Sequence, residues 1–216
     1  NVRPPRPISH EFLEIQDEYL TERNIERGIT DVATLTPVKS DSRLYIWQGD
    51  ITTLKCDAIV NACNSQMLGC FSPMHACIDN FIHTYAGVEL RLKMHEIMTK
   101  QGHEEETGKA KITSGYNLPA KYVLHTVGPI IQWKVTQEDE NLLASCYKEC
   151  LKLAADTGVE SIAFCCLSTG VFRFPQQRAA EIATETVMQF LKKDDRIKKV
   201  IFNVFKNEDL EIYSHL

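Results

Sequence analysis

The chain has 216 residues, of which 44% are hydrophobic and 25% charged, so it can bury one sizeable core and has the composition of a globular protein. Its formal net charge of −5 argues against broad nucleic-acid binding, which needs a basic surface. No apolar stretch reaches the roughly 18 residues of a membrane span, and Asn1–His10 lacks the apolar segment of a signal peptide.

The N-terminal part of the chain is expected to form an appendage to the main domain. Ser9–Arg27 is polar and charged but carries apolar residues at helical spacing, which predicts one helix. Residues 29–42 form a connector that contains Thr, Asp, Ser and Pro. We therefore predict a helical extension and connector over residues 1–42 and a main domain over residues 43–216.

Strands and helices alternate along the main domain. Short apolar runs predict strands at Leu44–Trp47, Asp57–Asn61, Lys111–Ser114, Tyr122–Val127, Ser161–Leu167 and Lys199–Val204. Longer periodic stretches predict helices at 76–86, Val88–Lys100, 138–156, Gln177–Lys192 and Glu208–His215. This α/β pattern is typical of a mostly parallel sheet with helices on both faces.

Three polar segments directly follow predicted strands, where ligands of such sheets bind. They are Gly49–Ile51, Asn61–Asn64 and Ser168–Arg173. The last could cradle a phosphate with its backbone N–H groups, since Gly170 permits a close approach. An ordinary turn between a strand and a helix is the alternative. We expect the three segments to meet in one cleft.

Single side chains in these segments allow two interpretations. Asp50 could cap a turn or helix, or accept a hydrogen bond from an amino group or a ribose hydroxyl. Asn61 and Asn64 could form turns, or donate to sugar hydroxyls.

The residues after Asn64 contain a possible metal site. Cys70, His75 and Cys77 offer two soft thiolates and one imidazole, which suit zinc, and three close ligands resemble a catalytic site with an open position. A loop with incidental cysteines is the alternative. Asp79 could be a carboxylate that starts a helix, an active-site base or a group that orients a ligand, and we expect His83 to pack in the interior.

Four further cysteines are interpreted as small buried hydrophobes. Cys146 and Cys150 lie in a predicted helix, and Cys165 and Cys166 in a predicted strand. Free thiols in a long chain without a secretion signal indicate an intracellular protein, which we expect in the cytoplasm.

Taken together, these segments resemble the macrodomain family from about Arg43 to the C-terminus. Asp50 and Ile51 look like the family's adenine-contacting pair, and Asp57–Asn64 looks like its signature strand end. His125–Pro129 matches a further segment of the family. The resemblance implies a three-layer α/β/α fold with a mixed, mostly parallel sheet. It also implies a loop around the pyrophosphate and distal ribose of ADP-ribose, formed by Ser168, Thr169, Gly170, Val171 and Phe172.

The segment Gly69–Cys77 replaces the glycine-rich run of ordinary hydrolytic macrodomains. It is similar to the zinc-containing class that accompanies sirtuin-type ADP-ribosyltransferases in microbes, which also has an N-terminal helical extension. The resemblance implies one zinc ion per chain at Cys70, His75 and Cys77, with Asn64 and Asp79 in catalysis. Arg173 departs from the usual glycine, so it would be strained if its φ is positive; otherwise its guanidinium could cover the phosphates or meet the modified protein.

The resemblance implies a hydrolase that removes ADP-ribose from mono-ADP-ribosylated proteins by cleaving the bond at C1″ of the distal ribose. Whether zinc activates water or positions the ribose stays open. The alternatives are a non-catalytic ADP-ribose reader with a structural zinc and a nucleotide phosphatase that acts on ADP-ribose derivatives. We expect a monomer that contacts no membrane, with a sirtuin-type transferase as a partner.

Overall fold

A six-stranded sheet forms the centre of the computed structural model, which describes residues 2–215. The strands lie in the order β2-β8-β7-β4-β6-β5. Their bounds are Leu44–Gln48 for β2, Ala58–Cys63 for β4, Ala110–Ser114 for β5, Tyr122–Val127 for β6, Ser161–Phe164 for β7 and Lys199–Val204 for β8. Only β5 pairs antiparallel, with β6, so the sheet is mixed and mostly parallel, as predicted.

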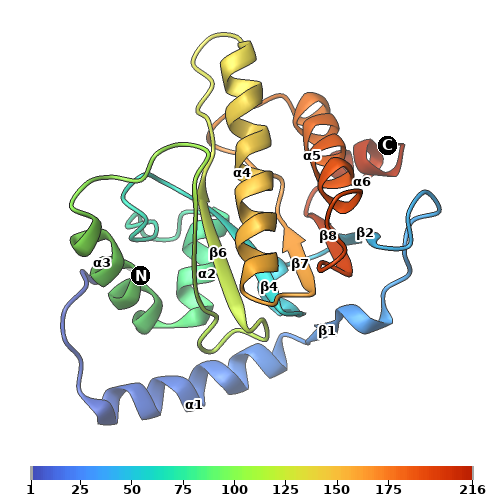
Figure 1. The fold of residues 1–216 in the computed structure, drawn as a ribbon. Helices are drawn as coiled ribbons and strands as arrows, with labels where there is room; N and C mark the ends of the chain where they lie inside the picture. Colours follow the sequence, from blue (N-terminus) through green and yellow to red (C-terminus); the bar gives the residue numbers. More distant parts are fainter. Residues whose placement is uncertain (1, 216) are drawn as a thin grey trace.

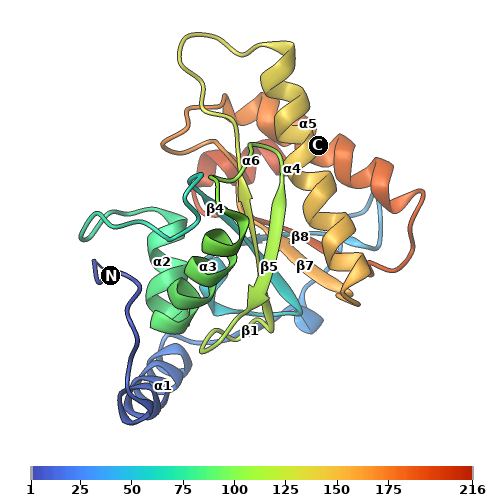
Figure 2. The ribbon, with the colours of Figure 1, turned by 60° about the vertical axis from the view of Figure 1, so that its left-hand side comes forward.

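Helices cover both faces of the sheet and complete the predicted three-layer α/β/α architecture. Figure 2 shows α2 and α3 on one side of the sheet and α4 and α5 on the other. The helix bounds are Ile78–Ala86 for α2, Val88–Gln101 for α3, Gln137–Asp156 for α4, Gln176–Leu191 for α5 and Asn207–Ser214 for α6. Each predicted helix of the main domain is therefore present, with ends that differ by a few residues.

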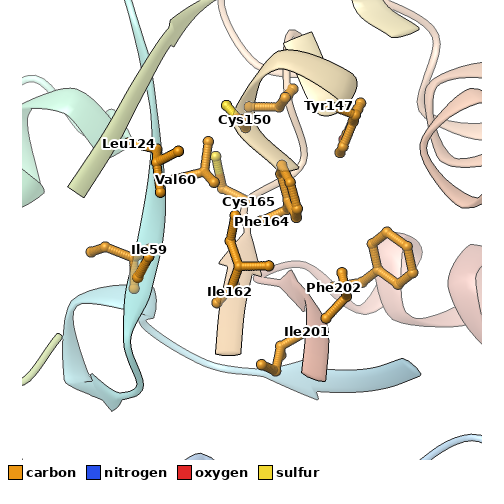
Figure 3. Close-up of a cluster of buried hydrophobic side chains, with 14 of the residues drawn as sticks. Ile59, Val60, Leu124, Tyr147, Cys150, Ile162, Phe164, Cys165, Ile201 and Phe202 are labelled. Atoms are coloured by element: carbon orange, nitrogen blue, oxygen red, sulfur yellow. The ribbon is translucent and has the colours of Figure 1, made fainter. Parts of the chain in front are cut away.

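The core lies between the sheet and these helices because the central strands are apolar on both faces, as expected for parallel strands. Val60 on β4 and Phe164 on β7 are buried, and the ring of Tyr147 on α4 packs against Phe164 with centroids 4.9 Å apart (Figure 3). Cys150 and Cys165 are also buried there, which confirms their interpretation as small hydrophobes.

Strand β7 is shorter than predicted. It ends at Phe164, the last residue of β7 that pairs with β4 and β8, whereas the apolar run predicted a strand to Leu167. Leu167 is buried although it lies outside the ladder. The apolar run therefore reported burial correctly, while hydrogen bonding to the neighbouring strands stopped three residues earlier.

The predicted N-terminal helix is α1, His10–Glu26, which lies against α2 and leads into the short strand β1, Thr30–Asp31 (Figure 1). The Ser9 hydroxyl caps its first turn. Its apolar stripe is mostly not buried: Leu20 is covered, but Ile15 is 64% and Tyr19 59% exposed. Because α1 contacts the main domain over only a small part of its surface, most of its apolar side chains remain exposed to solvent.

The segment that follows α1 is tied to the main domain by backbone pairing. Strand β1 pairs in parallel with β3, Leu54–Lys55, in a separate two-stranded sheet. The division at residues 42 and 43 stays a prediction, and the outer ends of the two predicted ranges, Asn1 and Leu216, lie outside the described residues. Within residues 2–215, no helix has the length and hydropathy to cross a membrane.

Candidate metal and ligand site

The segments predicted to form a cleft all leave the same edge of the sheet. Strands β2, β8, β7, β4 and β6 run parallel, so their carboxyl ends lie together. Asp50 follows β2, Asn64 follows β4, and Ser168–Arg173 follows β7. The long loop that carries the cysteines starts at the same edge, between β4 and α2.

Cys70, His75 and Cys77 converge in that loop. Their ligand atoms all lie within 4.8 Å of one another, and Cys70 Sγ is 3.4 Å from His75 Nδ1. Zinc bonds to sulfur and nitrogen are about 2.0–2.3 Å long, so small side-chain movements would let one ion bind all three atoms. Two thiolates and an imidazole are the donor set that zinc prefers. The three side chains fit one zinc ion.

The surroundings of the triplet are open on one side. His75 is exposed, while Cys70 and Cys77 are half-buried. His75 also lines a cavity of about 660 Å³ that lies between α2, α3 and the N-terminal segment. An exposed ligand beside such a space fits a three-ligand site with an open position better than a closed structural site.

The thiol of Cys77 is held in its neutral form when no cation is near. Burial, with a smaller effect of the neighbouring Cys70, raises the pKa of Cys77 to about 11. A metal ion would replace this proton, because only the thiolate is a good ligand. Metal binding at this loop should therefore release protons.

The loop reaches its position because Gly69 lies directly against a buried histidine. Gly69 has a φ of +83°, and a Cβ added there would be 2.8 Å from the ring of His83. His83 projects from α2 and is 5% exposed, which confirms its predicted interior position. Any residue larger than glycine would push the chain that carries Cys70 away from α2.

A chain of buried polar groups runs from α2 to the far strand of the sheet. Asn61 Nδ2 donates to Asp79 Oδ1 at 2.8 Å and lies 3.2 Å from His125 Nδ1. His125 Nε2 lies 2.9 Å from Thr113 Oγ1. Burial lowers the pKa of His125 to about 3, so its ring is neutral. The second N–H of the Asn61 amide points at His125 Nδ1, so Nδ1 accepts and the proton of the neutral His125 ring lies on Nε2. That proton is donated to Thr113 Oγ1.

Among these buried polar residues, Asp79 lies nearest in sequence to the metal loop. It lies in the first turn of α2, two residues after Cys77, and is 4% exposed. Burial raises the pKa of Asp79 to about 6, although the hydrogen bond from Asn61 and the charge of Arg91 oppose this shift. The Asn61 side chain is fully buried and holds this carboxylate, so it lies behind Asp79 rather than on an open surface.

Asp50 and Asn64 both take part in turns, as one of the two sequence interpretations proposed. Asp50 caps the 3₁₀ helix Ile51–Thr53 by accepting from the backbone N–H of Thr52 at 2.9 Å. Asn64 Oδ1 accepts from the backbone N–H of Gln66 at 3.1 Å. Both residues are half-buried, so a turn role leaves part of each side chain open to a ligand.

The loop after β7 has the tight backbone expected of an anion cradle. Ser168 is buried with a φ of +63°, and a Cβ on Gly128 would lie 2.0 Å from Ser168 Oγ. The loop closes through hydrogen bonds from Arg173 N to Gly170 O and from Phe174 N to Ser168 O, both at 3.0 Å. These contacts pack the start of the loop against the residues that follow β6.

The remaining loop residues differ in their exposure. Gly170 and Val171 are exposed, whereas Thr169 and Phe172 are half-buried. Arg173 has a φ of +60°, which settles the conformational question raised by the sequence. A side chain in this region costs roughly 1–2 kcal/mol relative to ordinary backbone, and Arg173 carries that strain while its side chain is exposed.

One contact of the predicted site residue Asp50 was not predicted from the sequence. The guanidinium of Arg27, just after α1, forms an ion pair with the carboxylate of Asp50. The two residues are 23 positions apart and belong to different parts of the chain. No local motif marks this pair, so only the three-dimensional arrangement reveals it.

The fold and the loops at the carboxyl edge of the sheet define a known class of protein. A sequence model of the family described as "Macro domain" matches residues 60–183. The chain therefore belongs to the macrodomain family.

The chain is similar to named relatives over its whole length. It is 59% identical to a protein-ADP-ribose hydrolase of Treponema medium, over 100% of this chain and 84% of that protein. It is 55% identical to a protein-ADP-ribose hydrolase of Staphylococcus aureus strain MRSA252, over 99% and 80%. A crystal structure of a Trypanosoma brucei macrodomain in complex with ADP-ribose has a TM-score of 0.78 at 30% identity, and the match covers 97% of this chain and 91% of that one.

Proposed function

We propose that this macrodomain is a zinc-dependent hydrolase that removes ADP-ribose from mono-ADP-ribosylated proteins. The convergence of Cys70, His75 and Cys77 beside the ligand-binding edge of the sheet carries the proposal. Full-length similarity to proteins named protein-ADP-ribose hydrolase supports the same reaction. The similar Trypanosoma brucei macrodomain was crystallised with ADP-ribose, which supports the ligand.

In this proposal each loop at the carboxyl edge of the sheet binds a different part of ADP-ribose. Asp50 accepts from the adenine amino group, and Ile51, the first residue of the same 3₁₀ helix, contacts the adenine through its backbone, because its side chain is buried in the core. The backbone N–H groups of residues 168–172 hold the diphosphate, since such turns attract anions. Phe172 covers the distal ribose, and Arg173 lies at the exposed end of the loop, where the modified protein would approach.

The reacting end of the ligand lies at the metal loop. Zinc at the triplet would supply positive charge beside the scissile C1″ bond. Asn64 donates to a hydroxyl of the distal ribose from the end of β4. Asp79 orients the attacking water as a hydrogen-bond acceptor, and Asn61 fixes its carboxylate from behind. The linkage is cleaved between C1″ and the protein side chain, so intact ADP-ribose leaves.

Product analysis tests this proposal. We expect incubation with a mono-ADP-ribosylated protein to return the unmodified protein and intact ADP-ribose, both identified by mass spectrometry. A nucleotide phosphatase that acts on ADP-ribose derivatives would instead release inorganic phosphate and leave the modified protein unchanged. A reader would form a stable complex without changing either mass. Either of these two results, obtained with zinc-loaded protein on substrates of every common linkage, would refute the hydrolase.

Two further features remain proposals. A sirtuin-type ADP-ribosyltransferase would supply the modified protein that this site consumes, and the protein would act as a monomer, since one chain carries all the proposed site residues.

A further inference from the structure

Arg27 connects the N-terminal extension to the proposed adenine contact. Its Nη2 donates to Asp50 Oδ2 and, at 2.9 Å, to Thr52 Oγ1. Thr52 completes a ring of contacts, because its backbone N–H and its hydroxyl donate to Asp50 Oδ1 at 2.9 and 2.6 Å. Both carboxylate oxygens are thereby fixed in direction.

Arg27 is itself held in place from three sides. Its guanidinium carbon lies 3.4 Å from the centroid of the Tyr85 ring, at the end of α2. Its Nη1 donates at 3.1 Å to the Oδ1 of Asn24, and Asn24 Nδ2 donates to the carbonyl of Asn117 at 2.7 Å. The Arg27 side chain is only 17% exposed. Such a planar, stacked and hydrogen-bonded guanidinium is a rigid support.

The contacts leave Asp50 with a defined capacity for a ligand. An ionised carboxylate accepts at about four lone-pair positions. Arg27 Nη2, the Thr52 N–H and the Thr52 hydroxyl occupy three of them. The Asp50 side chain is still 32% exposed, so the position that remains can be reached from outside. It suits one N–H donor in a fixed direction.

We propose that Arg27 is a positioning residue that sets the nucleobase specificity of this site. It locks the Asp50 carboxylate so that its one free acceptor position meets the exocyclic amino group of adenine. This inference rests on the proposed function, because it requires Asp50 to face the base of ADP-ribose.

The rigid support is what makes the contact selective. A 6-oxo base, such as hypoxanthine, presents a carbonyl oxygen where adenine presents its amino group, and that oxygen repels a fixed carboxylate. A carboxylate freed from Arg27 can turn away from the carbonyl and accept instead from the N1–H of the 6-oxo base. Loss of Arg27 should therefore weaken adenine binding and reduce discrimination between the two bases.

Binding of ADP-ribose and of its hypoxanthine analogue, inosine diphosphate ribose, tests this assignment by titration calorimetry. We expect the wild-type protein to prefer ADP-ribose. Arg27→Ala should lose about tenfold in affinity for ADP-ribose, as expected for a hydrogen bond to a charged group, and less than threefold for the analogue. Arg27→Lys keeps the charge but not the planar fork, so its affinity for ADP-ribose should lie between those of the wild-type protein and Arg27→Ala. Arg23→Ala, in an exposed pair with Glu26, is the matched control and should change neither affinity.

The outcomes separate this inference from the proposed function. In turnover assays, the Arg27 variants should raise KM and leave kcat within about twofold, because the reacting bond is at the other end of the ligand. Equal losses for both ligands, or unchanged discrimination, would overturn the role of Arg27. If Arg27→Ala does not fold, the reduced discrimination expected of Arg27→Lys decides the matter. A wild-type protein that binds ADP-ribose selectively without hydrolysing it would refute the hydrolase but not this inference.

Discussion

Replacement of Cys77 by alanine is expected to remove zinc from the protein and to lower kcat by at least about 100-fold. Substitution of a residue that only supports a metal ligand typically lowers metal affinity or activity 10–100-fold. Cys77 would be a ligand itself, so its loss should cost more. Its sulfur belongs to the group of three ligand atoms that lie within 4.8 Å of one another. The two side chains left after the substitution could not hold the ion firmly.

Cys56, at the end of β4 opposite the metal loop, provides the matched control for Cys77→Ala. Cys56 lies just before β4, whereas the metal loop follows that strand, and the Cys56 thiol donates to Ala58 O at 3.2 Å. Cys56→Ala removes one thiol without touching the loop, so zinc content and kcat should stay within about twofold of wild type. Metal analysis by mass spectrometry and the de-ADP-ribosylation rate are the two measurements. Retention of one zinc per chain by Cys77→Ala would contradict the ligand assignment.

Replacement of Asp79 by asparagine should have the second large effect, a loss of about 100- to 1,000-fold in kcat with zinc still bound. Groups that take up or steer a proton contribute about 10²–10⁴-fold to catalysis. The substitution keeps the size of the side chain but removes its negative charge. It also converts one of the two acceptor oxygens into an NH₂ donor, so the one remaining oxygen can accept from Asn61 Nδ2, which approaches Oδ1 at 2.8 Å, or from the water, but not from both through separate oxygens. Both changes disturb the orientation of water and leave the sulfur and imidazole ligands in place.

Asp209 offers a matched control for this substitution. It is a buried carboxylate on α6, 6% exposed, and accepts from Gln176 Nε2 at 2.8 Å. Asp209→Asn makes the same chemical change at a carboxylate that is similarly buried and also hydrogen-bonded to a side-chain amide, but away from the metal loop. Its kcat should therefore change less than threefold. Zinc content, affinity for ADP-ribose and kcat should be measured for both variants. An Asp79→Asn protein with bound zinc and full kcat would remove Asp79 from the mechanism.

The alternation of helix and strand made the main domain predictable from sequence. Periodicity and burial report the same property there, so strands such as β4 and helices such as α4 lie where the pattern placed them. The rule that ligands bind at strand carboxyl ends then brought Asp50, Asn64 and Ser168 to one edge of the sheet. The convergence of Cys70, His75 and Cys77 was predicted from their ligand chemistry and from the resemblance to the zinc-containing class, because an interval of seven residues can span about 25 Å when extended and does not by itself bring side chains together.

Other features of the site depend on contacts between distant segments and could not be predicted in this way. The contact of Asn61 with His125 joins residues 64 positions apart, and that of Arg27 with Asp50 joins an extension to a strand end. The exposed apolar residues of α1 show a second limit of sequence analysis. Periodicity predicted the helix but not how much of its surface the main domain covers.

The claim that zinc at Cys70, His75 and Cys77 serves hydrolysis is tested most directly by restoring the metal to stripped protein. Zinc would be added stepwise to protein freed of metal by a chelator, and bound zinc and the rate of ADP-ribose release would be measured in the same samples. We expect the rate to rise in proportion to bound zinc and to level off at one ion per chain. Full activity of the verified metal-free protein would contradict the account.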